Sequence, residues 1–249
     1  MSWVVIERCA TGIPGFDNLC QGGLVRNSTN LLLGGPGSGK TTFLLQFLWN
    51  GVTKYNENGL YCSFEPDIVE TLKDAISYGW DFSKLNEQDR IKFMRFSPHT
   101  SVDDLKSELT KVISKYDIKR ICFDPVSVLT LNTDNDGKIR EVLYEIASLM
   151  KRLRVTSILA DESIESFQTN YHGKSVENST DILRFLTDGV IHMHEFGLSG
   201  VGDRAVQISK MRRTKHVRVP VGMEVGDRGI NILLESLSRM PDQEPVIPD

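Results

Sequence analysis

Apolar runs of β-prone residues recur along the chain, with helical patterns between them. The runs that predict strands are Thr29–Leu33, Leu60–Phe64, Ile91–Phe96, Ile121–Phe123, Thr156–Ala160, Val190–His194 and Ala205–Ile208. Helical periodicity places apolar side chains on one face of Thr41–Trp49, Ser101–Lys115 and Lys138–Arg154. Strands that alternate with helices of this length are typical of βαβ units. We therefore predict an α/β fold with a mostly parallel sheet flanked by helices.

Turn and capping signals divide the rest of the chain. Ser101 is followed three residues later by Asp104, which resembles a helix capping box with Asp in place of Glu. The polar stretch Ser163–Ser179 shows little periodicity, so we predict a long surface loop there. From Val190 the pattern predicts antiparallel strands joined by short turns, ending in a hairpin around Gly226–Gly229.

The length of 249 residues suits one large domain. We expect that domain to cover residues 1–240. Residues 241–249 contain three prolines and are expected to form a flexible tail.

Composition describes an ordinary globular chain with 40% hydrophobic residues, 25% charged residues and a formal net charge of −4. That balance argues against a protein that coats nucleic acid through bulk charge. The four cysteines show no CxxC spacing, which favours a reduced, cytoplasmic compartment. Charged residues come too early for a signal-peptide core, and no apolar run approaches the ~20 residues of a membrane span. We therefore expect no membrane segment.

The strongest chemical signal lies between the first predicted strand and the first predicted helix. It satisfies the phosphate-loop pattern GxxxxGK(S/T) through Gly34, Gly35, Pro36, Gly37, Ser38, Gly39, Lys40 and Thr41. Glycines let successive backbone N–H groups point at phosphate oxygens, and the start of the helix adds its positive end. Lys40 would reach the β- and γ-phosphates, and Thr41, with Thr42 beside it, would offer its hydroxyl to Mg²⁺. We predict that the chain binds ATP with Mg²⁺ and hydrolyses it.

A P-loop needs a second group to hold magnesium, and Asp124 is the candidate. It ends the short apolar strand Ile121–Phe123, where P-loop proteins place such an acid. The alternative is that Asp124 only begins a turn before Pro125. We predict that Asp124 and Thr41 share the metal.

Hydrolysis also needs a group that positions or deprotonates water. Glu65 follows the second predicted strand and is the candidate, although it could instead cap a helix that begins at Pro66. Asp161 and Glu162 end a later strand. They could sense the γ-phosphate or be plain strand-end charges, and the sequence leaves both open.

With these residues in place, the chain resembles the KaiC family of the RecA superfamily, in the single-domain form found widely in archaea. The resemblance covers about residues 8–235. The matching blocks occur in family order, and they are Thr11–Asp17, Gly22–Leu24, the P-loop, Phe64–Glu65, Ser77–Asp81, Lys210–His216 and Asp227–Asn231. The resemblance implies a RecA-like P-loop NTPase core.

The resemblance also implies assembly. Members of this family form rings, usually hexamers, with ATP between subunits. By position, Lys210 and Arg212 would reach the phosphates held by a neighbouring subunit. The other residues implied at the nucleotide are Thr214, His216 and Asp227 in the neighbour's wall, and Ser77 and Tyr78 near the adenine.

One departure from the family pattern keeps two other functions open. The family commonly has two consecutive glutamates where this chain has Glu65-Pro66, so turnover should be slow or absent. The preferred hypothesis is a slow ATPase ring that acts as a conformational or partner-binding switch. The alternatives are a DNA-binding recombination accessory like the RadA paralogues, and a module that binds ATP without hydrolysis. With one ATPase copy, a circadian clock role and autophosphorylation are poorly supported.

Overall fold

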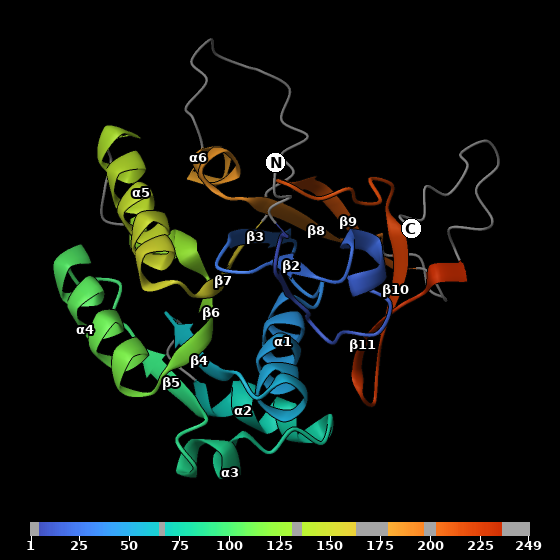
Figure 1. Cartoon of the computed structure of the whole chain (residues 1–249), viewed down its shortest axis with the longest axis horizontal. Helices are drawn as coiled ribbons and strands as arrows, with labels where there is room; N and C mark the ends of the chain where they lie inside the picture. The colour runs from blue at the N-terminus through green and yellow to red at the C-terminus, as the bar shows by residue number, and fades with distance from the viewer. Residues whose placement is uncertain (1–4, 65–67, 131–135, 163–178, 197–202, 236–249) are drawn as a thin grey trace.

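The computed structural model describes residues 5–64, 68–130, 136–162, 179–196 and 203–235, and a nine-stranded sheet crosses them (Figure 1). The strand order is β11-β10-β9-β8-β3-β7-β6-β4-β5. In chain order the strands are β3 (Thr29–Gly34), β4 (Asn58–Ser63), β5 (Ile91–Arg95), β6 (Ile118–Asp124), β7 (Thr156–Glu162), β8 (Gly189–Glu195), β9 (Arg204–Met211), β10 (Val221–Gly226) and β11 (Gly229–Ile232).

The sheet has a parallel part and an antiparallel part. Strands β8, β3, β7, β6, β4 and β5 run parallel, and β9, β10 and β11 add antiparallel strands at one edge. A separate two-stranded ribbon pairs β1 (Arg8–Cys9) with β2 (Leu24–Val25). The predicted α/β fold with C-terminal antiparallel strands is confirmed, including the hairpin at Gly226–Gly229.

Helices connect the strands. The α-helices are α1 (Lys40–Tyr55), α2 (Ile68–Ser77), α3 (Phe82–Glu87), α4 (Val102–Lys115), α5 (Asp136–Leu153) and α6 (Ser179–Leu186), and 3₁₀ turns cover Asp17–Cys20 and Val126–Thr130. None of these described helices is long and apolar enough to cross a membrane.

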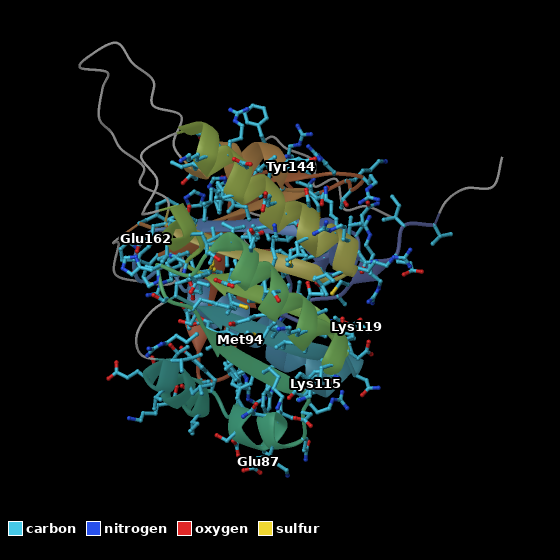
Figure 2. The ribbon with its side chains drawn as sticks, turned by 90° about the vertical axis from the view of Figure 1, so that its left-hand side faces the viewer. Glu87, Met94, Lys115, Lys119, Tyr144 and Glu162 are labelled. Atoms are coloured by element: carbon cyan, nitrogen blue, oxygen red, sulfur yellow. The ribbon has the colours of Figure 1, made fainter. Side chains whose placement is uncertain are left out.

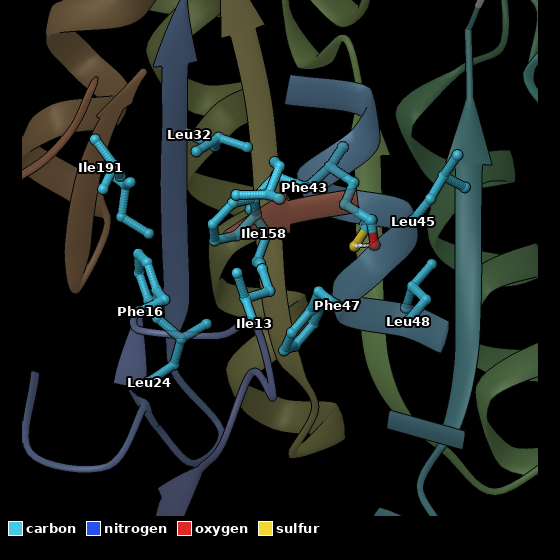
Figure 3. Close-up of a cluster of buried hydrophobic side chains, with 14 of the residues drawn as sticks. Ile13, Phe16, Leu24, Leu32, Phe43, Leu45, Phe47, Leu48, Ile158 and Ile191 are labelled. Carbon is cyan, nitrogen blue, oxygen red and sulfur yellow. Dashed lines mark hydrogen bonds between the residues drawn. The ribbon is translucent and has the colours of Figure 1, made fainter. Parts of the chain in front are cut away.

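Alternation along the strands builds two hydrophobic cores, one on each face of the sheet. On β3, Leu32 faces the core shared with α1, whereas Leu31 and Leu33 face the core shared with α4, α5 and α6. Figure 3 shows the first core, where Phe43 and Phe47 of α1 meet Ile158 of the sheet and the N-terminal segment. Figure 2 shows α4 and α5 side by side over the second face. Both faces are therefore covered, as a parallel sheet requires.

Most of the predicted elements are shorter than the observed ones. The helix predicted over Thr41–Trp49 continues to Tyr55, and the strand predicted over Ile121–Phe123 runs from Ile118 to Asp124. Helix α5 ends one residue before the predicted Arg154, because Arg154 adopts a left-handed backbone with φ 53°. Strand β4 ends at Ser63, one residue before the predicted Phe64.

Two further predictions need correction. Ser179, predicted as the end of a loop, begins helix α6, and the rest of that loop lies outside the described residues.

Ser101 does cap α4 by accepting a hydrogen bond from the Asp104 N–H (3.1 Å). The return bond of a capping box is replaced by one from the Ser101 hydroxyl to the Asp104 carboxylate (2.6 Å). The predicted tail over residues 241–249 lies outside the described residues.

A buried ion pair joins Arg120 of β6 to Glu57, which lies between α1 and β4. The Arg120 side chain is 1% exposed, donates to Glu57 Oε2 (2.7 Å) and to the Phe47 carbonyl (3.0 Å), and lies over the Phe47 ring. Arg26 donates to the other Glu57 oxygen at 2.7 Å. Burial alone would raise the pKa of Glu57, but the charges and hydrogen bonds of Arg120 and Arg26 outweigh it and lower that pKa.

Replacing Glu57 by glutamine should destabilise the fold. The change keeps the side-chain volume and leaves the Arg120 charge buried without a counter-ion, which costs about 3–5 kcal/mol. Because the folded pKa of Glu57 is lowered, its contribution is present above the unfolded value of about 4.3 and is lost as the pH falls through the folded value. Urea unfolding at pH 7 and at decreasing pH would measure this, with the exposed Glu87→Gln as control. Equal midpoints at pH 7 for Glu57→Gln and wild type would contradict it.

Candidate nucleotide-binding site

The P-loop lies where β3 ends and α1 begins. Gly37 and Gly39 have φ angles of 77° and 96°, in the left-handed region that favours glycine. Gly39 is the N-cap of α1, and no side chain caps this helix end, so the first N–H groups of α1 are available to an anion. A methyl group at Gly34 would come within 2.7 Å of the Met193 carbonyl oxygen, so this position also requires glycine.

Two polar side chains of the loop face its interior. The Lys40 ammonium donates to the carbonyls of Gly34 (2.8 Å) and Gly35 (2.9 Å), so it lies folded over the loop. The Ser38 hydroxyl is buried, and no described residue offers it a hydrogen-bond partner. A buried hydroxyl without a partner is costly unless a ligand satisfies it. These groups suit a phosphate held by the loop.

Asp124 meets Thr41 although 83 positions separate them in the sequence. The Thr41 hydroxyl donates to Asp124 Oδ2 at 2.8 Å, which joins the first turn of α1 to the end of β6. Burial raises the pKa of Asp124, and the hydrogen bonds from Thr41 and Tyr61 and the charge of Lys40 oppose that rise. A carboxylate and a hydroxyl are oxygen ligands of the kind that Mg²⁺ prefers. The structure thus brings the two predicted metal ligands together.

The other predicted acids differ in their surroundings. Asp161 is buried and accepts hydrogen bonds from the Glu162 N–H (3.0 Å) and the Thr180 hydroxyl (3.3 Å), which links β7 to the first turn of α6. Burial is the main cause that raises its pKa. Glu162 is exposed and pairs in register with Gly34 of the P-loop. Glu65 lies outside the described residues, so its role stays a prediction.

The pair predicted near the adenine ends helix α2. The Ser77 hydroxyl donates to the Asp74 carbonyl (2.6 Å), and the Tyr78 ring packs on Trp80 with centroids 4.8 Å apart. Trp80 lies against Gly229 in the hairpin β10–β11. The Ser77-Tyr78 pair therefore belongs to a cluster that includes this hairpin.

Lys210 and Arg212 lie far from the P-loop of their own chain. Lys210 pairs with Val190 on β8, three residues, or roughly 10 Å, before Met193, which pairs with Gly34. The Lys210 ammonium donates to the carbonyls of Arg184 and Thr187 at the end of α6, both at 2.7 Å. Burial and the charge of Arg212 lower the pKa of Lys210.

Arg212 uses the same helix end. It donates to the Phe185 carbonyl (3.3 Å) and lies 3.6 Å from an Asp188 oxygen. Within this chain, both cations are therefore held at the end of α6.

Of the remaining predicted contacts, Thr214 and His216 are half-buried and Asp227 is exposed. Thr214 accepts a hydrogen bond from Arg8 (2.6 Å), and His216 Nδ1 lies 3.2 Å from the Thr214 carbonyl oxygen. Asp227 is exposed at the tip of the β10–β11 hairpin. In that hairpin, Val225 lies beside Gly39, so Asp227 stands on the side of the P-loop of its own chain.

The family model described as "ATPase: KaiC" matches residues 9–236. The chain belongs to the KaiC family of ATPases. It is 28% identical over 236 residues to the circadian clock oscillator protein KaiC of Parasynechococcus marenigrum, covering 91% of this chain and 45% of that protein. The KaiC of Synechococcus elongatus is also 28% identical over 236 residues, with 91% and 44% covered. The chain therefore spans less than half the length of these curated relatives.

A solved structure agrees with this assignment. The KaiC-like protein of the hyperthermophilic archaeon Pyrococcus horikoshii superposes with a TM-score of 0.79 and 31% identity, covering 92% of this chain and all of that one. The resemblance to the KaiC family and the RecA-like fold predicted from the sequence are confirmed.

Two residues of this KaiC-family site were not predicted from the sequence. The Tyr61 hydroxyl donates to Asp124 Oδ2 at 2.8 Å, the same oxygen that Thr41 contacts. Glu195 ends β8 beside the P-loop, where a methyl group on Gly37 would come within 2.9 Å of its Oε2. An available signal for Tyr61 was a tyrosine inside an apolar strand, since a buried phenol needs a hydrogen-bond partner.

Proposed function

We propose that this KaiC-family chain binds ATP with Mg²⁺ at Gly34–Thr42 and hydrolyses it slowly. In this proposal it works in the cytoplasm as a homo-oligomeric ring, a hexamer by analogy with the family. Nucleotide at the subunit interfaces would then drive a conformational or partner-binding switch. The observation that carries the proposal is the hydrogen bond between Thr41 and Asp124 beside an uncapped helix start. It sets two oxygen ligands next to a cradle for phosphates.

The described residues suit the parts of such a site. Thr41 and Asp124 would hold Mg²⁺, and the bound ion supplies charge neutralisation on the phosphate oxygens. Lys40 needs only to leave the carbonyls of Gly34 and Gly35 to meet a phosphate. The first N–H groups of α1 would donate to the phosphate oxygens, and the Ser38 hydroxyl would gain a partner.

Water activation and the trans-acting cations belong to the same proposal. Glu65 would position or deprotonate the attacking water, and the proline that follows it in place of a second glutamate predicts slow turnover. Lys210 and Arg212 would complete the site of the adjoining subunit. In their own chain both side chains contact carbonyls at the end of α6 instead of the P-loop, which supports that role.

Light scattering with and without ATP and Mg²⁺, combined with a phosphate-release assay on the same samples, tests assembly and turnover together. We expect the mass to rise toward a ring when both are present and inorganic phosphate to accumulate slowly. Assembly with intact ATP after long incubation would instead support the non-hydrolysing module. A protein that ignores ATP in calorimetry with Mg²⁺ present would contradict the whole proposal.

A further inference from the structure

Tyr61 reaches Asp124 from the neighbouring strand. In the parallel pairing of β4 with β6, Tyr61 lies opposite Cys122, two residues or about 7 Å before Asp124. The long phenol side chain spans this offset, and its hydroxyl donates to Asp124 Oδ2 at 2.8 Å, a normal length for an O–H···O bond. Tyr61, two residues before the end of β4, thus contacts the carboxylate at the end of β6.

The Asp124 oxygen that accepts from Tyr61 is already engaged. Thr41 donates to the same Oδ2 at 2.8 Å, so one oxygen takes two hydroxyl donors, one from α1 and one from β4. Asp124 is 8% exposed, so water cannot readily replace either donor. Two donors from different elements define the orientation of a carboxylate better than one. Rotation about the Cβ–Cγ bond of Asp124 would break both hydrogen bonds.

Packing does not require the hydroxyl of Tyr61. The ring is 2% exposed and packs on Phe93, with centroids 5.9 Å apart, in the core beneath α1. Phenylalanine would fill the same space without a polar atom to satisfy. We therefore assign a role to the Tyr61 hydroxyl through its hydrogen bond with Asp124.

We propose that Tyr61 is a positioning residue that holds Asp124 beside Thr41, in the orientation that receives Mg²⁺ with bound ATP. This inference rests on the proposed function, since it assigns Tyr61 to the same nucleotide site. Hydrogen-bonding partners of metal-ligating side chains typically contribute 10–100-fold in metal affinity or activity. For Tyr61 we expect about a 10-fold contribution, specific to the metal-dependent part of binding.

The test compares wild type with Tyr61→Phe, which removes one oxygen atom and keeps the ring. Calorimetry of the full chain with a non-hydrolysable ATP analogue is carried out once with saturating Mg²⁺ and once with EDTA. The ratio of the two affinities in each protein reports the metal contribution and cancels differences in folding. Tyr144→Phe makes the same chemical change on the exposed face of α5 and serves as the control.

We expect Tyr61→Phe to bind the analogue like wild type in EDTA and to lose about 10-fold of the Mg²⁺-dependent gain. Tyr144→Phe should keep the wild-type ratio. An unchanged ratio in Tyr61→Phe would overturn the inference, and so would an equal loss with and without Mg²⁺, because packing alone would then explain Tyr61. Wild type that fails to bind the analogue would overturn the proposed function itself, which is a distinguishable result.

Discussion

Lys40→Ala should reduce phosphate release by at least about 100-fold, because catalytic sites lose 10²–10³-fold when one donor to the developing charge is removed. The structure gives a specific reason for a large effect. Lys40 is the cation of the loop itself, and its ammonium stands over the carbonyls of Gly34 and Gly35. Alanine would leave the backbone N–H groups to face the triphosphate without this charge. Phosphate release at saturating ATP and Mg²⁺ measures the loss.

The matched control for this experiment is Lys111→Ala. Lys111 is exposed on α4, on the opposite face of the sheet from α1, so its removal changes the net charge by the same amount. We expect wild-type phosphate release from this variant. Equal rates for Lys40→Ala and wild type would reject the P-loop as the source of activity.

Local patterns were sufficient for much of the fold and for the centre of the site. The P-loop needs a glycine-rich turn between a strand and a helix, and both neighbours are visible in the sequence. Asp124 could be identified because a charged residue directly follows the apolar run Ile121–Phe123 at the end of β6. Its contact with Thr41 follows from the parallel sheet, which brings strand ends to one edge.

Features that depend on partners distant in the sequence could not be predicted. A buried arginine contradicts the usual burial preference, and Arg120 is tolerated only because Glu57, the Phe47 carbonyl and the small Gly51 surround it. Helix α6 begins directly after a polar stretch, so its start carried no clear signal. The strand register that brings Tyr61 to Asp124 is likewise not readable from either strand alone.

The placement of Lys210 and Arg212 leads to the second large prediction. Both cations are held by carbonyls at the end of α6 in their own chain, so we expect them to act at the nucleotide of another subunit. Cations supplied in trans at phosphoryl-transfer sites contribute 10³–10⁵-fold to the rate. We expect Lys210→Ala with Arg212→Ala to lower phosphate release by about 10³-fold. Analogue binding should be retained, since Lys40, Thr41 and Asp124 stay intact.

Mixing two inactive variants separates a trans role from a structural one. A subunit with Lys40→Ala still offers intact cations, and a subunit with Lys210→Ala and Arg212→Ala still offers an intact P-loop. In randomly mixed rings, roughly one quarter of the interfaces combine the two intact halves. Phosphate release should therefore recover to about a quarter of the wild-type rate once subunits exchange. If the mixture only adds the two residual rates, the cations act within their own chain, as caps of α6, and the interfacial site is rejected.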